Sequence, residues 1–102
     1  MSVRPLVLAG PLGRIEISGD ALEAVAIGAV RTVAGAGLAR GRRVVEIETE
    51  DGTAEARVVI TAEAGAALPD VGEHVQRAVA AALAATTGLE VRVDVSVVGL
   101  TT

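Results

Sequence analysis

The clearest pattern in the chain is a strict alternation of apolar and polar positions over residues 89–97. The apolar set is Leu89, Val91, Val93, Val95 and Val97, and the polar set is Glu90, Arg92, Asp94 and Ser96. Such alternation predicts a half-buried strand. Residues 44–49 and 54–62 alternate as well, on either side of Asp51-Gly52, which predicts a β-hairpin. A shorter alternation over residues 14–17 predicts the first strand.

Two other segments repeat their apolar residues at helical spacing. The first follows Ser18 and Asp20, either of which can cap a helix, and Gly35 is its expected end. The second begins at Pro69, a residue suited to the first helical position, and ends at Thr87-Gly88. Their apolar stripes are Leu22, Val25, Ala26, Ala29 and Val33 in the first helix and Val71, Val75, Val79 and Leu83 in the second.

The elements therefore follow the order β-α-β-β-α-β. This order predicts an α+β fold, a two-layer sandwich with two helices packed on one face of a small mixed sheet. The other face of the sheet is expected to be open to solvent. Residues 1–12 contain Pro5, Gly10 and Pro11 without a sustained period and are expected to form a tail. Residues 13–102 are expected to form a single domain.

Composition narrows the classes of function. The chain has no cysteine, which excludes a disulfide and a thiolate metal site. It has no aromatic residue, so the core is built from small aliphatic side chains and no ring is present on which a base could stack. The net charge of −4 disfavours nucleic acid as a partner. No segment has the pattern of a signal peptide, and a cytoplasmic protein is expected.

Candidate catalytic residues are few. His74 is the single histidine and is expected on a helix surface. None of the three serines, Ser2, Ser18 and Ser96, lies in a nucleophile-elbow pattern. The sequence therefore predicts neither an enzyme nor a bound cofactor. Four acidic residues, Glu46, Glu48, Glu50 and Asp51, could hold a cation weakly, but a solvated sheet face is the preferred interpretation and no metal site is predicted.

Two features are candidates for binding a partner. Arg40, Arg42 and Arg43 follow a glycine-rich stretch and form a candidate interaction loop for phosphate, anionic lipid or an acidic partner. Alternatively, these arginines pair with the nearby glutamates or are simply solvated. Val59 and Val98 are expected among charges on the open sheet face, which makes that face a candidate interaction face.

Four segments carry a family resemblance. They are residues 13–18 (Gly-Arg-Ile-Glu-Ile-Ser), 26–35 ending in Val-Ala-Gly, 71–79 with Gln76, and 87–100 beginning Thr-Gly-Leu. In this order they resemble the alkaline shock protein family, also called the Gls-type envelope stress response family. The resemblance implies a cytoplasmic protein without catalytic activity that self-associates. It also implies a position beneath the membrane, through binding to a membrane-anchored partner.

The leading hypothesis is therefore a non-enzymatic scaffold of the envelope stress response. Its expected partners are further copies of itself and a membrane-anchor protein, which would bring it close to the membrane. The alternative is a small RNA-binding module that uses the loop with Arg40 and Arg43, although its support is limited to those arginines. A sensor of a small ligand or a metal is a third hypothesis.

Overall fold

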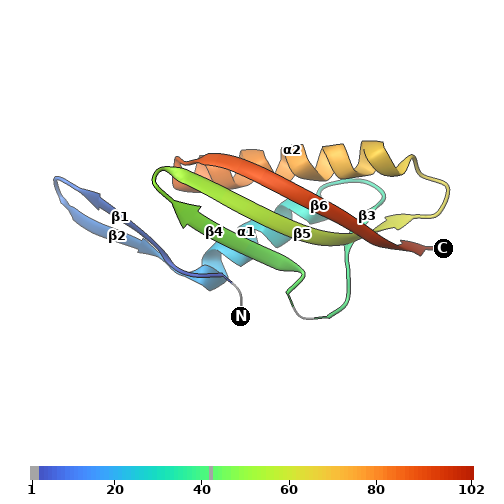
Figure 1. Cartoon of the computed structure of the whole chain (residues 1–102), viewed down its shortest axis with the longest axis horizontal. Helices are drawn as coiled ribbons and strands as arrows, with labels where there is room; N and C mark the ends of the chain where they lie inside the picture. Colours follow the sequence, from blue (N-terminus) through green and yellow to red (C-terminus); the bar gives the residue numbers. More distant parts are fainter. Residues whose placement is uncertain (1–2, 42) are drawn as a thin grey trace.

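The computed structural model describes residues 3–41 and 43–102 of the chain. Figure 1 shows the elements in space. In chain order they are β1 (Leu6–Gly10), β2 (Gly13–Ile17), α1 (Gly19–Arg31), β3 (Ala36–Leu38), β4 (Val45–Glu50), β5 (Thr53–Glu63), α2 (Leu68–Thr87) and β6 (Glu90–Thr101). The predicted α+β class is confirmed. The predicted order is present as β2–α1–β4–β5–α2–β6, with β1 and β3 in addition.

The main sheet is mixed, as predicted, and β5 is its central strand. β6 runs parallel to β5 along one edge, while β3 and β4 pair antiparallel with it. The backbone N–H of Ala39 donates to the Val59 carbonyl at 3.1 Å, and that of Val59 donates to the Val44 carbonyl at 2.8 Å. β3 and β4 therefore follow one another along the same edge of β5, opposite β6.

One face of this sheet is closed by both helices. α2 packs against β6 and α1, and α1 packs against β3 and β4. Alternate residues of β5 (Ala54, Ala56, Val58, Ile60 and Ala62) are buried beneath them, as the alternation predicted for Ala56, Val58 and Ile60. The largest fully buried side chains are Leu22, Ile60, Leu83, Val30, Val58, Val75 and Val79. The core is thus made of many small contacts, which suits a chain without aromatic residues.

The helix ends match the predicted signals in part. Ser18 caps α1, because its hydroxyl accepts the N–H of Ala21 at 3.1 Å, whereas Asp20 lies in the first turn. α1 ends at Arg31, with Thr32 as its C-cap, and not at Gly35, since the backbone turns to begin β3 at residue 36. α2 carries Pro69 in its first turn and ends at Gly88, whose φ of 74° is left-handed.

The predicted hairpin between β4 and β5 is confirmed. Asp51 and Gly52 adopt φ angles of 44° and 81°, the left-handed pair that a tight two-residue turn needs. Only glycine adopts such an angle without steric cost.

Replacing Gly52 with alanine should lower the free energy of unfolding by roughly 1 kcal/mol, because a Cβ at positive φ is strained. Urea unfolding followed by circular dichroism measures the change. Gly72→Ala is the control, because Gly72 is helical with open space around it. This substitution should stabilise the protein slightly. Equal effects of the two substitutions would contradict the turn geometry.

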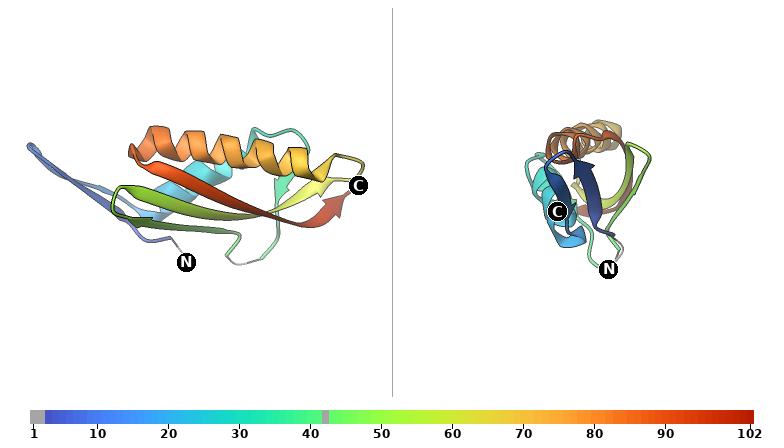
Figure 2. Two further views of the ribbon diagram at one scale, coloured as in Figure 1. Left: turned by 45° about the horizontal axis from the view of Figure 1, so that its top comes forward. Right: turned by 90° about the vertical axis from the view of Figure 1, so that its left-hand side faces the viewer.

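The N-terminal residues differ from the tail expected over residues 1–12. β1 pairs with β2 in a separate two-stranded sheet, with Leu6 opposite Ile17 and Gly10 opposite Gly13. We call this hairpin, residues 6–17, the arm. Figures 1 and 2 show it projecting from one end of the molecule, which is 51 Å long. The first predicted strand therefore lies in the arm and not in the main sheet.

The base of the arm is fixed by the segment before it. Val3 forms a parallel bridge with Ile47 of β4 and is buried. Leu6 is also buried in the core, and Ile17 packs against it. Beyond these residues the arm leaves the body.

Among the described residues, neither helix is long and apolar enough to cross a membrane. The expected cytoplasmic location stays a prediction.

Candidate functional site

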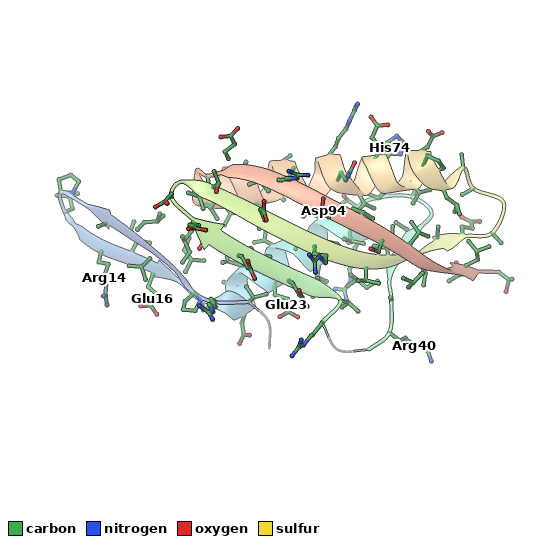
Figure 3. The ribbon with its side chains drawn as sticks, in the orientation of Figure 1. Arg14, Glu16, Glu23, Arg40, His74 and Asp94 are labelled. Carbon is green, nitrogen blue, oxygen red and sulfur yellow. The ribbon has the colours of Figure 1, made fainter. Side chains whose placement is uncertain are left out.

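The predicted arginine loop lies at the sheet edge between β3 and β4. Arg40 and Arg43 are exposed, and Arg40 points away from the body (Figure 3). Arg42 lies outside the described residues. Within the described part of the chain, the ion pair to Glu46 comes from Arg57 at 3.8 Å and not from this loop. Arg40 and Arg43 are thus exposed, and among the described residues neither forms an ion pair with the glutamates.

The open face of the main sheet has a charged half. Glu46, Arg57, Arg92 and Asp94 lie there, with an ion pair of 4.0 Å between Arg92 and Asp94. Arg57 and four carboxylates line a hollow on this face. The carboxylates are those of Glu46, Glu48, Glu55 and Asp94. No group of three or more acidic, histidine or cysteine side chains placed to hold a metal ion occurs among the described residues. Within the acidic cluster, Glu46 has Arg57 as a counter-charge, while Glu48, Glu50 and Asp51 are exposed.

The predicted interaction face lies at the other half of the open face. Val59 is half-buried opposite Ser96 in the register of β5 and β6. Val98 is the extra residue of a β-bulge, since Ile60 pairs with Val97 and Thr61 with Gly99, and it is 63% exposed. The bulge explains the exposure of Val98, because a bulged residue leaves the regular pairing of the ladder.

The described residues among those considered for catalysis have separate structural positions, and Ser2 lies outside the described residues. His74 is exposed on α2 and points away from the molecule (Figure 3). The carboxylate of its neighbour Glu73 accepts a hydrogen bond of 2.6 Å from the Arg77 guanidinium, one helical turn on. Ser18 caps α1, and Ser96 lies on β6. These side chains come from different elements and have the local roles expected from the sequence.

The arm is the feature that the sequence interpretation missed. Leu6, Leu8, Ile15 and Ile17 share one face of it, because Leu6 pairs with Ile17 and Leu8 with Ile15. The opposite face carries Arg14 and Glu16, which project from the same side of β2 (Figure 3). This opposite face is mixed, because Glu16 pairs with Val7 and Arg14 with Ala9, and the outer half of the arm lies beyond the core.

Three of the six exposed large apolar residues of the described chain lie on this arm. Leu12 at its tip is fully exposed, at 102%, Ile15 is 63% exposed and Val7 is 46% exposed. The other exposed large apolar residues of the described chain are Leu68, Val98 and Leu100, near the start of α2 and the end of β6. The signal that could have revealed the arm is the apolar run at residues 6–9, followed by Gly-Pro and then by the alternation over residues 14–17.

Comparison with known proteins identifies the fold and no family. No family model matches the chain, and no curated protein matches it. Solved structures titled MamM CTD match it, among them a triple variant with a TM-score of 0.55 and 16% identity, covering 78% of this chain and 93% of that chain. A nickel form (TM-score 0.55, 16% identity) and a copper form (0.54, 16%) each cover 78% of this chain, and 96% and 95% of their own chains. At this identity the likeness establishes the shared fold alone.

These matches correct the expected function. The prediction of an envelope-stress scaffold is wrong on this comparison, because the structures of like fold are MamM CTD and not alkaline shock proteins. They lend no support to the RNA-binding alternative either. The nickel and copper forms concern that protein alone. The sequence resemblance itself stays a prediction, which these matches do not test.

Proposed function

We propose that this chain works through protein–protein contact, as a module that associates with further copies of itself through the arm. The observation that carries this proposal is that Leu12 and Ile15 are exposed on a hairpin projecting from the body. In this proposal the chain has no catalytic role. A membrane-anchored partner stays a prediction, since no described surface selects one.

The arm is the part of the structure that needs a partner. A two-stranded hairpin is marginally stable by itself in water, and three strands or a packed face are needed for independent stability. Here the base is held by Leu6, Leu8 and Ile17, which pack in or against the core, whereas Ile15 on the same face is 63% exposed. Contact with a second molecule would bury this face and hold the two strands together.

The body, in contrast, is complete without a partner. Its core includes residues of both helices and of β4, β5 and β6. Among the described residues, no buried side-chain polar atom lacks a hydrogen-bond partner. Single exposed apolar residues are common on monomers, but several on one projecting element indicate an interaction site. The arm is therefore the preferred contact element.

The proposal predicts that Leu12→Ser/Ile15→Ser weakens self-association at least tenfold, because both apolar side chains leave the interface. Sedimentation equilibrium with interference optics measures the association without needing aromatic absorbance. Val98→Ser/Leu100→Ser is the matched control, with side chains 63% and 58% exposed on β6. Association lost only in the control would contradict the arm and support the open sheet face instead.

A further inference from the structure

We infer that two copies join by antiparallel pairing of their β2 strands, centred on Ile15, into a four-stranded sheet in which β2 and the partner's β2 are the middle strands. This inference rests on the proposed function, because it names the interface through which self-association takes place. It follows from three properties of the arm: a free edge, a charge pattern complementary to itself, and the absence of a helix packed on its described residues.

The free edge is the outer edge of β2. Within the described chain, β2 pairs with β1 and with no other strand. A two-residue turn is closed by a hydrogen-bonded pair, here Gly10 and Gly13. Alternation then directs the backbone groups of Ile15 toward β1 and those of Arg14 and Glu16 outward. The outer edge thus offers donors and acceptors on either side of Ile15.

Charge selects the register. With Ile15 opposite the partner's Ile15, Arg14 lies opposite the partner's Glu16, and Glu16 lies opposite the partner's Arg14. Centring on Arg14 or on Glu16 would instead place like charges directly opposite, which is destabilising. Within one chain an Arg14 guanidinium nitrogen lies 3.9 Å from a Glu16 carboxylate oxygen. The two side chains are 70% and 55% exposed, so both remain available to a partner. The same register aligns the outward backbone groups of both residues.

Apolar side chains fit this register as well. Ile15 meets the partner's Ile15 at the centre, on the face that also carries Leu8 and Ile17. Leu12 at the tip falls opposite the partner's Ser18, which caps α1 at the base of the partner's arm. Each tip therefore reaches the region where the other arm joins its body. The contact is isologous, the arrangement of most homodimers.

The edge of β6 has a similar charge pattern but does not suit a second copy. Arg92 and Asp94 flank Val93, as Arg14 and Glu16 flank Ile15. However, α2 packs on β6, and the Gln76 side chain donates to the Val93 carbonyl at 3.1 Å. Pairing there would bring two α2 helices to about one strand spacing, roughly 5 Å, whereas packed helices stay about 8–10 Å apart. The arm carries no helix and avoids this overlap.

Charge reversal tests the register. Arg14→Glu alone, or Glu16→Arg alone, places like charges opposite each other twice and should weaken association about tenfold. The double variant Arg14→Glu/Glu16→Arg restores unlike pairs and should associate within about threefold of the natural chain. An equimolar mixture of the two single variants should also associate, as a heterodimer. At protein concentrations low enough for the chain to be monomeric, unfolding curves should be unchanged, because both side chains are exposed.

Each outcome of this experiment decides something. If the natural chain sediments only as a monomer of 10.2 kDa, both the proposed function and this inference are overturned. If it associates but the single variants associate equally well, the register is overturned while the proposed function stands. The register is also overturned if the single variants are weakened and neither the mixture nor the double variant recovers association.

A cysteine substitution provides a second measurement. The chain has no cysteine, so Ile15→Cys introduces a single thiol that the register places opposite the same residue of the partner. Mild oxidation should give a covalent dimer. Val98→Cys is the control, because both positions are 63% exposed. Equal dimer yields from the two variants would contradict the pairing of β2.

Discussion

Replacing Leu22 with alanine is expected to lower the free energy of unfolding by about 2–5 kcal/mol. Leu22 lies on α1 with no exposed surface and is among the largest fully buried side chains. The core has no aromatic residue that could move into the space, and its other members are small. The cavity would therefore stay largely open, and a small domain could lose much of its stability.

Urea unfolding followed by circular dichroism measures this loss, because the helices give a strong signal and the chain has no tryptophan. Leu12→Ala is the matched control, since Leu12 is fully exposed at the tip of the arm. The control should change the stability of the monomer by less than about 0.5 kcal/mol. A loss below about 1 kcal/mol for Leu22→Ala would show that α1 does not pack as described.

Replacing Gly19 with alanine is expected to release the N-terminal segment from the body. A Cβ at Gly19 would collide with the backbone carbonyl of Val3, and a backbone atom cannot move aside as a flexible side chain can. Val3 in turn bridges Ile47 and precedes the buried Leu6. Overpacking of this kind costs about 1–3 kcal/mol, and here the cost would fall on the attachment of the arm.

Hydrogen exchange measured by mass spectrometry would report this release as faster exchange in residues 3–10, with α2 and β6 unchanged. Gly28→Ala in the same helix is the control, because nothing lies within 4 Å of its added Cβ. It should stabilise the protein by up to about 1 kcal/mol through helix propensity. If residues 3–10 exchange slowly in both variants, the result would contradict the close packing of Val3 on Gly19.

The long elements of the fold could be predicted from the sequence because each carries a sustained period. β5, β6 and α2 alternate or repeat over enough residues for the pattern to stand above chance, and Asp51-Gly52 defines the turn. β3 has three residues, Ala36, Gly37 and Leu38, with no alternation. It is a strand because β5 extends past the end of β4 and offers an edge there, which is a tertiary effect.

The candidate site was harder to predict, for a physical reason. The alternation over residues 14–17 indicates a strand, but it does not say which strand it pairs with. β1 is not predicted because the segment contains Pro5, Gly10 and Pro11, residues that are typical of irregular structure. Pro11 in fact lies in the turn between β1 and β2, where proline is tolerated. The alternation also does not say what covers the apolar side of the strand, and the arm carries Ile15 beyond the core, where it is 63% exposed. In the sequence, an apolar strand face that binds a partner has the same alternating pattern as one that packs against the core.

The shared fold with MamM CTD does not transfer a function, because one fold supports many roles. The arm precedes the body formed by α1, β3, β4, β5, α2 and β6, and it carries the exposed Leu12 and Ile15. Interaction surfaces of this kind depend on a few side chains, so they can differ between proteins whose cores are alike.

The central claim, self-association through the arm, is tested most directly by sedimentation equilibrium of the natural chain over a wide range of concentration. The account predicts a weight-average mass that rises with concentration from 10.2 kDa to twice that value. It also predicts that this rise disappears in Leu12→Ser/Ile15→Ser. A constant mass of 10.2 kDa up to millimolar concentration would contradict the account.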